Sequence, residues 1–247
     1  MSQKIENKIL GVTSLRRIKI TLIVITVVFC LLFIFALSFR SGFILDFLGI
    51  HIELPIGKKV IVPDDYSLVD SNNNGIPDPI EIVNAARYEV KQRTKYQSNY
   101  YAGGYPPDDE GVCTDVIWRG LKGAGINLKD LMDKDIKNNI ELYPRTNGLR
   151  EPNIDFRRVP NQYVFFERFA ESLTTEIIPG DIENLKKWQP GDIVVFKGLN
   201  HVAIVSDRRA RDGTPFIIHN SPPFASEVKL KSLNREIKGH YRWKYNK

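Results

Sequence analysis

Cysteine is scarce in this sequence, because only Cys30 and Cys113 occur among its 247 residues. Cys30 lies within a long apolar run near the N-terminus, so Cys113 is the only thiol in the residues that follow Arg40. A single cysteine excludes an intramolecular disulfide in that part of the chain. Three roles stay open for Cys113: a packed thiol, one half of an intermolecular bridge, or a nucleophile.

The main part of the chain also lacks an excess of either charge. The formal net charge is +6, but residues 1–40 hold six basic residues against one acidic residue and therefore account for +5 of it. The remaining residues carry only +1, which does not indicate a nucleic-acid-binding surface. Internal repeats and low-complexity tracts are missing too. The composition, 43% hydrophobic and 26% charged, fits one globular domain of ordinary size plus shorter segments.

Charged residues are absent from Ile20 to Phe39, an apolar run of twenty residues with only three polar side chains. A helix of that length spans a bilayer core of roughly 30 Å, whereas a buried core helix usually keeps a polar face. A cleaved signal peptide is the main alternative, because Ala36-Leu37-Ser38 has small residues at cleavage-site spacing. The run is longer than the roughly 7–15 residues of a signal h-region, which favours an uncleaved signal anchor.

Basic residues directly before this run indicate its orientation. Arg16, Arg17 and Lys19 precede it, and positively charged residues tend to stay on the cytoplasmic side of a membrane. We therefore expect residues 1–19 to form a cytoplasmic tail and everything after Arg40 to be extracytoplasmic. This predicts a single-pass protein of the cell membrane, with the bilayer as its first partner.

The pattern of apolar residues outlines the elements of the main domain. Residues 40–69 are mixed in character and indicate a stalk or linker with one or two short strands. Helical spacing predicts helices over residues 79–95 and 113–123, whereas residues 126–172 are rich in loops with short helices. Helices followed by a small antiparallel sheet make an α+β domain, which we place at residues 82–247. The predicted strands are rich in Val, Ile and Phe and cover residues 192–197, 201–206 and 214–219.

The stretch 70–81 has the spacing of an EF-hand-type calcium loop. Oxygen-bearing side chains fall at its first, third, fifth, ninth and twelfth positions, a glycine falls at the sixth, and the seventh would contribute its backbone carbonyl. The same residues fit a plain helix start, with Asp78 as N-cap and Pro79 in the first turn. No helical pattern precedes the loop, so we expect at most half an EF-hand holding a structural calcium ion. The predicted ligands are Asp70, Asn72, Asn74, Ile76, Asp78 and Glu81.

Cys113 lies where a loop rich in Gly, Pro and Asp changes into the predicted helix over residues 113–123. Unpaired N–H groups and the helix dipole lower the pKa of a thiol at a helix N-terminus, and a nearby imidazole lowers it further. His201 begins one predicted strand and His219 ends the next, so a hairpin would bring both imidazoles to the same edge of the sheet. A base oriented by a second polar group is the general arrangement for covalent catalysis.

The segment WQPGDIVVFKGLNHVAIVSD resembles the corresponding segment of NlpC-type papain-fold cysteine hydrolases, which cleave amide bonds in bacterial cell-wall peptides. In that resemblance Cys113 matches the nucleophile, His201 the base and His219 the orienting residue. Tyr100 stands in the Tyr-x-x-Gly-Gly segment that precedes the nucleophile. A closer resemblance, over about residues 70–247, is to an uncharacterised bacterial domain-of-unknown-function family related to these enzymes. Its hallmarks in this sequence are GGYPP, GVCTDV, NIDFRRVPN, PGDIV, IHN and GHYRW.

Two features depart from the NlpC pattern. Val112 and Thr114 flank Cys113, where that family usually has Asp-Cys-Ser-Gly. The insertion between Cys113 and the predicted sheet is also long. These departures leave the substrate pocket, and hence the bond that is cleaved, open.

Other polar residues are candidates for contacts with a substrate. Tyr100 can assist an oxyanion beside the backbone N–H of Cys113, or it can pack as one of several aromatic residues. Arg157 and Arg158 in NIDFRRVPN can hold a substrate carboxylate, or they can form a salt-bridged loop. Asn220 can support the histidine beside it through a hydrogen bond.

Taken together, these patterns predict a membrane-anchored, extracytoplasmic thiol hydrolase, either an amidase or a peptidase, with a Cys113–His201–His219 triad. The resemblance and the location imply that its substrates are peptidoglycan peptides. Two alternatives stay open: an acyl or peptidyl transferase with the same triad, and a non-catalytic cell-wall binding or assembly module.

Overall fold

The computed structural model describes residues 17–33, 46–51 and 58–245, which belong to two compact units divided between residues 44 and 45. In the first unit, residues 17–33 form a helix. No helix in the described ranges combines the length and the apolar character that crossing a membrane requires. The predicted span runs on to Phe39, and its residues 34–39 lie outside the described residues.

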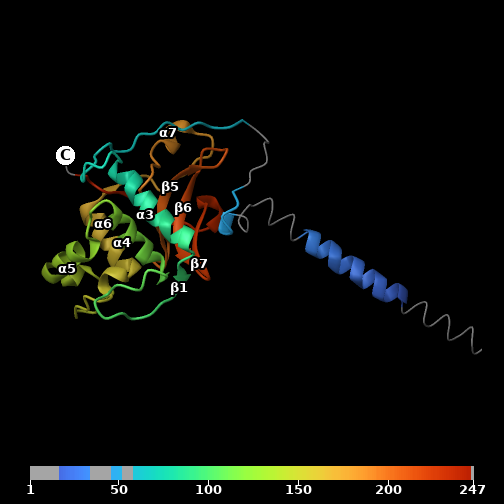
Figure 1. The fold of residues 1–247 in the computed structure, drawn as a ribbon, viewed down its shortest axis with the longest axis horizontal. Coiled ribbons are helices and arrows are strands. Elements are labelled where there is room, and N and C mark those ends of the chain that lie inside the picture. The colour runs from blue at the N-terminus through green and yellow to red at the C-terminus, as the bar shows by residue number, and fades with distance from the viewer. Residues whose placement is uncertain (1–16, 34–45, 52–57, 246–247) are drawn as a thin grey trace, which may run out of the picture. The chain divides into compact units, whose positions relative to one another are not determined.

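The second unit has an α+β fold, as the sequence pattern predicts, with helices packed on one sheet (Figure 1). Helices α3 and α4 correspond to the two predicted helices. A full helix at α6 was not predicted, because its sequence looks loop-rich. The helices are α3 (Asp78–Gln92), α4 (Cys113–Gly123), α5 (Leu128–Asn138), α6 (Val159–Phe169) and α7 (Ile182–Leu185), with 3-10 turns η1 (Ile140–Leu142), η2 (Asp155–Arg157) and η3 (Leu230–Leu233).

Eight strands form the sheet in the order β2-β1-β7-β6-β5-β4-β8-β3. They pair antiparallel except β1 and β2, which are parallel. The three predicted strands are β4, β5 and β6, and β5 and β6 form the expected antiparallel hairpin, with Ile204 opposite Ile218. The strands are β1 (Lys95–Tyr96), β2 (Glu110–Gly111), β3 (Glu171–Ser172), β4 (Ile193–Phe196), β5 (Val202–Arg209), β6 (Pro215–Ser221), β7 (Phe224–Lys229) and β8 (Ile237–Arg242).

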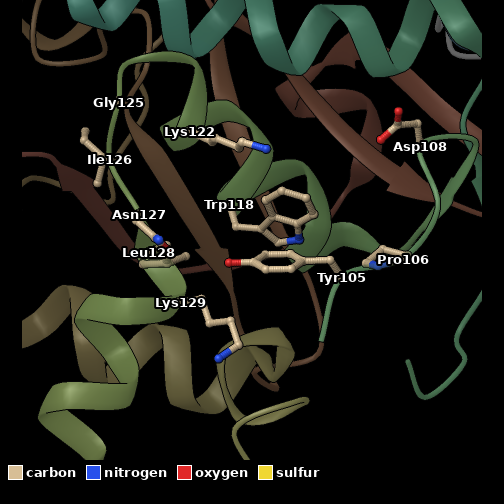
Figure 2. Close-up of a pocket in the computed structure, with 10 residues that line it drawn as sticks. All are labelled: Tyr105, Pro106, Asp108, Trp118, Lys122, Gly125, Ile126, Asn127, Leu128 and Lys129. Atoms are coloured by element: carbon tan, nitrogen blue, oxygen red, sulfur yellow. The ribbon is translucent and has the colours of Figure 1, made fainter. Parts of the chain in front are cut away.

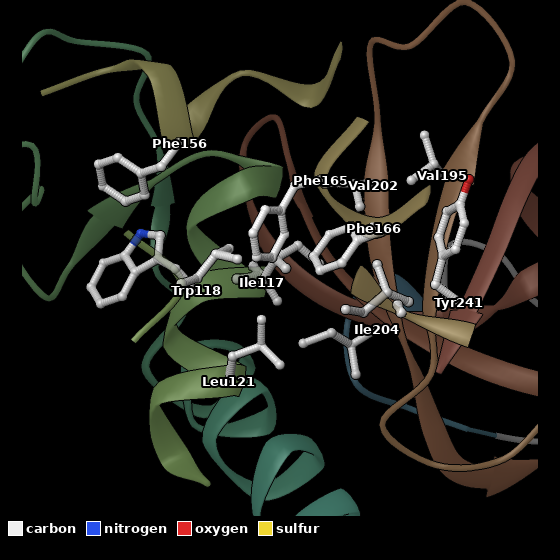
Figure 3. Packing of buried hydrophobic residues seen from close by; sticks show 14 of the residues in the cluster. Ile117, Trp118, Leu121, Phe156, Phe165, Phe166, Val195, Val202, Ile204 and Tyr241 are labelled. Atoms are coloured by element: carbon white, nitrogen blue, oxygen red, sulfur yellow. The ribbon is translucent and has the colours of Figure 1, made fainter. Parts of the chain in front are cut away.

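Apolar side chains along α4 bury one side of that helix against the sheet. Ile117 and Leu121 are fully buried and face Ile204 of β5, and Phe165 and Phe166 of α6 pack beside them (Figure 3). Helix α3 packs against α4 and lies across β5, β6 and β7 (Figure 1). Burial of each such side chain stabilises the fold by about 1.5–3 kcal/mol. This core holds the N-terminus of α4 in a fixed place relative to the sheet.

Residues 58–69, which we predicted to belong to a stalk, are part of the second unit and pack on its other residues. The backbone N–H of Val60 donates to the carbonyl of Arg211 at 2.8 Å, and Val62 is buried. The predicted short strands do not form in residues 46–51 or 58–69, the described part of that segment. Of the apolar side chains that suggested strands, Val62 is buried against the domain, whereas Ile61 is exposed.

The motifs PGDIV and GHYRW meet in the fold. Asp192, directly before β4, accepts a hydrogen bond from Arg242 Nε at 2.7 Å and lies 3.0 Å from His240 Nε2. The His240 ring stacks on Trp188, with 3.8 Å between ring centroids. All of these groups are buried or partly buried, so they join β4 to β8 and have a structural role.

Candidate active site

Cys113 is the first residue of α4, and its side chain is buried. Val112 before it is extended, and its N–H donates to Asp115 Oδ2 at 2.8 Å, which closes the first turn of the helix. The backbone of Val202 donates a hydrogen bond to the Cys113 sulfur. Because Val202 directly follows His201, the sulfur lies at the start of β5.

The hairpin of β5 and β6 brings two imidazoles together, as the positions of His201 and His219 predict. His201 Nε2 lies 3.0 Å from His219 Nδ1, and the two rings are nearly perpendicular, at 88°. Ser226 of β7 is paired with His219 in the sheet, and its Oγ lies 3.3 Å from His219 Nε2. All three side chains are buried, so the cluster forms a short polar chain within the sheet.

Burial decides the protonation states of these groups. It raises the pKa of Cys113 to about 11, although backbone hydrogen bonds lower it in part. Burial also lowers the pKa of His201 to about 4, assisted by the positive charge of Arg235. It lowers the pKa of His219 to about 3, where the charges of His201 and Arg235 add to the effect.

The N–H groups at the helix start do lower the pKa of Cys113, as expected, but burial outweighs them and the net shift is upward. Removing the sulfur from water disfavours the thiolate more than the nearby N–H groups favour it, and the negative charge of Asp115 acts in the same direction as burial. At neutral pH the site consists of a neutral thiol and two neutral imidazoles.

A buried ion pair fixes the first turn of α4. Arg157 donates from Nε to Asp115 Oδ1 at 2.7 Å and from Nη2 to Oδ2 at 2.8 Å, which is a two-point contact. Trp118 Nε1 donates to the same carboxylate at 2.8 Å, and Thr114 Oγ1 donates to the Arg157 carbonyl at 2.9 Å. Both members of the ion pair are buried. Arg157 thus positions the residues around Cys113. Of the two roles that we considered for it, the contacts agree with the salt bridge and not with an arginine that is open to a substrate carboxylate.

The other two predicted substrate contacts are also used within the fold. Arg158 donates from Nη1 to the carbonyl of Arg145 and to Asp155 Oδ1. The Asn220 side chain is buried, and its amide donates to the carbonyls of Thr94 and Gly111 at 3.3 and 3.1 Å. These contacts hold the Arg158 loop and strands β1 and β2 in place, although the buried Asn220 Oδ1 has no hydrogen-bond partner among the described residues.

Tyr100 is exposed and takes part in a different cluster. Its hydroxyl donates to Glu151 Oε1 at 3.1 Å and accepts from Asn153 Nδ2 at 2.8 Å. Tyr96 is the tyrosine closer to the thiol: burial raises its pKa, and the negative charge that Cys113 would carry as a thiolate raises it further. No sequence motif marks Tyr96; the parallel pairing of β1 with β2 brings it opposite Gly111, two residues before the thiol.

The predicted calcium loop brings several of its members together through hydrogen bonds. Asp70 accepts the N–H groups of Asn74 and Gly75 at 3.1 and 2.7 Å. Glu81 accepts the side-chain amides of Asn72 and Asn74 at 2.9 and 2.5 Å.

Asp78 is turned away from this group. Its carboxylate accepts the N–H and the hydroxyl of Ser71 at 2.8 and 2.6 Å, and it is the first residue of α3, where we predicted an N-cap. Across the described residues, no three acidic, histidine or cysteine side chains converge on one point. A cation here would therefore depend on amide and carbonyl oxygens as well as Asp70 and Glu81.

A cavity of about 420 Å³ lies beside the C-terminal part of α4 (Figure 2). The rings of Tyr105 and Trp118 meet edge to face in it, 4.8 Å apart between centroids. Lys122 Nζ lies 6.0 Å from the Trp118 ring, and Lys129 lies beyond Tyr105. Cys113 is not among the residues that line it, and neither histidine of the pair is, so the cavity is separate from the thiol and imidazole cluster.

Comparison with known proteins shows which family the chain belongs to. Residues 83–243 match the family described as "Domain of unknown function (DUF1287)", a span that includes Cys113, His201 and His219. The chain belongs to this family. A relative in Escherichia coli (strain K12), named "Uncharacterized protein YijF", is 35% identical over 195 residues, which cover 75% of this chain and 89% of the relative. The predicted membership of a DUF family is confirmed, whereas the relation of DUF1287 to NlpC-type enzymes stays a prediction.

Proposed function

We propose that this DUF1287 protein is a cysteine amidohydrolase or peptidase with a papain-like, NlpC-type domain. The observation that supports this most is the position of Cys113, at the N-terminus of α4 with its sulfur at the start of β5, where His201 is paired with His219. A thiol, a base and a group that orients the base are the minimal set for nucleophilic acyl transfer. Here they come from three different elements that share one core.

In the proposed reaction the Cys113 sulfur attacks the carbonyl carbon of an amide while its proton passes to His201 Nδ1. The protonated imidazole then gives this proton to the leaving amine, so the C–N bond breaks and a thioester remains. Water attacks the thioester with His201 again accepting a proton, and the departing sulfur takes that proton back as the acid is released. Each turnover consumes one water and restores the thiol.

The tautomers required for this reaction agree with the observed contacts. If His201 Nε2–H donates to His219 Nδ1, the Nδ1 atom of His201 keeps a free lone pair for the thiol proton. His219 Nε2–H then points to Ser226 Oγ, so His219 positions the base. Because the resting thiol and imidazoles are neutral, the proposed attack requires transfer of the thiol proton to His201.

Two groups near the thiol can stabilise the oxyanion that develops in this reaction. The backbone N–H of Cys113 is at the first position of α4, where helix N–H groups lack intrahelical acceptors. We assign the second donor to the Tyr96 hydroxyl, since Tyr96 pairs with Gly111, two residues before the thiol, whereas the Tyr100 hydroxyl is engaged with Glu151 and Asn153.

The substrate class and the location rest on the sequence. The resemblance to cell-wall hydrolases favours peptidoglycan peptides as substrates. The uncharged run from Ile20 to Phe39, preceded by basic residues, favours an anchor that leaves the domain outside the cytoplasmic membrane. Protease accessibility of the tail and domain in sealed spheroplasts tests this orientation, and cleavage of the domain only after lysis would contradict it.

Mass spectrometry of purified peptidoglycan fragments tests the proposed activity. Wild-type full-length chain should release products with one new amine and one new carboxylate, and Cys113→Ala should release none. His201→Ala should lower the rate by at least about 100-fold, since general base catalysis contributes roughly that much. Product release that survives Cys113→Ala would reject the thiol mechanism.

One observation favours a second candidate function, that of a binding module without catalytic activity. The raised pKa of Cys113 and the lowered pKa of His201 mean that neither group is charged at rest. A binding module would retain fragments in a pull-down equally well with wild type and Cys113→Ala, without any product in either sample.

We also propose a structural calcium ion in the loop 70–81. The residues that would hold it are Asp70, Asn72, Asn74 and Glu81 with the carbonyl of Ile76, because Asp78 is engaged with Ser71. Calorimetry of the full-length chain should detect calcium uptake at millimolar concentration or below, and Glu81→Gln should remove it. The control Glu183→Gln, in α7, should bind as wild type does; no heat with wild type would end the proposal.

A further inference from the structure

Arg235 is held beside the turn that leads into His201. Its Nη1 donates to Asn200 Oδ1 at 3.1 Å, and Asn200 is the residue before His201. The backbone on both sides is fixed as well. Asn234 adopts a left-handed conformation with φ 47°, and the carbonyl of Glu236 accepts the N–H of Lys197 at 2.8 Å. The guanidinium is therefore placed by the fold, although the side chain is exposed.

The charge of Arg235 is not neutralised by the acid next to it. Both carboxylate oxygens of Glu236 bind Lys197 Nζ, at 2.8 and 2.7 Å. Within the residues that the structure describes, Arg235 forms no ion pair with a carboxylate, and its contact is with the neutral side chain of Asn200. A guanidinium has five N–H donors, so most of them stay available for a ligand.

A cavity of about 350 Å³ adjoins this group. Its walls include the apolar side chains of Ile177, Leu230 and Ile237, with Arg235 among the polar residues that line it. That volume is at the lower end of the range found for small-molecule sites. Lys231 and Glu236 also line it, but they are paired with Asp212 and Lys197 respectively. Cys113 and the two histidines do not line it, so the recess would hold the part of a ligand that extends beyond the pair. Apolar walls next to Arg235 suit a small organic anion with an aliphatic part.

We propose that Arg235 binds a carboxylate of the substrate next to the His201–His219 pair, which makes it a residue that determines specificity. This inference rests on the proposed function, because the bound carboxylate belongs to a substrate only if the protein is the proposed hydrolase. Arg157 and Arg158, the arginines that the sequence suggested for this task, are engaged with acidic or backbone groups of the fold. A carboxylate matches the two-point geometry of a guanidinium, and an amide in its place would lack the charge.

The electrostatics of the pair agree with this proximity. The positive charge of Arg235 lowers the pKa of His201 and of His219. A bound carboxylate would offset that charge and make His201 a stronger base. Substrate binding and activation of the base would then be linked.

Two alkylating reagents that differ in charge test the inference at Cys113. The full-length chain is treated with iodoacetate, which carries a carboxylate, and with iodoacetamide, its neutral analogue, and alkylation of Cys113 is followed by peptide mass spectrometry. Rates are divided by those of N-acetylcysteine to remove the intrinsic reactivity of each reagent. Wild type should prefer iodoacetate, and Arg235→Gln should lower the normalised ratio about three- to tenfold. Arg235→Lys should keep part of the preference, and Lys238→Gln, which removes another exposed cation of the same segment, should leave it unchanged.

A binding measurement keeps the inference testable if Cys113 reacts with neither reagent. In ¹⁵N spectra, the Arg235 Nε–H signal should shift on titration with N-acetylalanine and not with N-acetylalaninamide. An unchanged reagent ratio in Arg235→Gln together with no shift would overturn the inference, even where Cys113-dependent cleavage is observed. A carboxylate-specific shift without any cleavage of peptidoglycan would instead support the anion site at Arg235 and contradict the proposed hydrolase activity.

Discussion

The thiol of Cys113 illustrates how two effects on one residue oppose each other. The helix N-terminus favours a thiolate, and burial of the sulfur disfavours it. With a pKa of about 11, the thiol is protonated over the whole neutral range. Reactivity of the free protein at this residue should therefore depend on the small thiolate fraction that is present at each pH.

We predict that the rate of Cys113 alkylation by iodoacetamide rises about tenfold per pH unit from pH 7 to pH 10, because the thiolate fraction rises by that factor below the pKa. The measurement is peptide mass spectrometry of the full-length chain at fixed reagent concentration. A plateau from pH 5 to pH 8 would mean a resting thiolate–imidazolium pair and would contradict the neutral state described above.

The ion pair of Asp115 and Arg157 is the second feature at this scale. Replacing Asp115 by Asn leaves a guanidinium buried without a counter-charge, which costs about 3–5 kcal/mol of unfolding free energy. Urea unfolding of the full-length chain measures this. Lys197→Gln serves as the matched control, since it breaks an ion pair that is largely exposed and should cost less than about 1 kcal/mol. Equal losses in the two variants would show that the buried pair does not stabilise the start of α4.

At the scale of elements, the loop before α4 depends on close approach of its backbone to η2. Gly103 and Gly104 both have positive φ, 82° and 87°. A Cβ at Gly104 would lie 2.8 Å from the Phe156 ring and 3.0 Å from the carbonyl of Asn153, whereas a Cβ at Gly103 would meet nothing within 4 Å. The two glycines therefore share the same backbone strain and differ in the space around them.

We predict that Gly104→Ala lowers the unfolding free energy by about 1–3 kcal/mol more than Gly103→Ala does, because only the first forces η2 to move. Thermal or urea unfolding of both variants provides the comparison. Similar losses would indicate that the φ values alone decide the cost.

The hairpin of β5 and β6 shows which elements can be read from sequence. Short runs of Val, Ile and Phe with turn residues between them predict these strands, and the hairpin places His201 near His219 without further information. The outer strands β1, β2 and β3 have two residues each, which is too short for any periodic signal. Their positions follow from pairing with strands distant in sequence, and this is how Tyr96 comes close to the thiol.

At the scale of the whole molecule, the two buried imidazoles link stability to pH. In the unfolded chain they take up protons near the ordinary pKa of 6.5, whereas in the folded chain they do so only near 4 and 3. Between these values the unfolded state binds more protons. Stability is therefore full above pH 6.5 and falls as the pH is lowered through this window.

We predict a loss of about 2–4 kcal/mol of unfolding free energy between pH 7 and pH 5, since one proton contributes at most about 1.4 kcal/mol per pH unit. Urea unfolding at a series of pH values measures it. His219→Gln, which removes one of the two groups, should reduce the slope by about half. A flat profile for wild type over this range would show that the imidazoles are not buried as neutral groups.

The sequence by itself determined the α+β class, the helix that starts at Cys113, the hairpin that joins the two histidines and the membership of the DUF family. These are local or pairwise properties, carried by the spacing of apolar residues and by motifs within one or two elements. Only the tertiary structure decided that Arg157 binds Asp115, that Tyr100 and Arg158 are engaged with other groups, that Arg235 contacts the residue before His201, and that burial makes the resting thiol neutral. Contacts between distant segments and the exclusion of water depend on packing in three dimensions, which no spacing along the chain records.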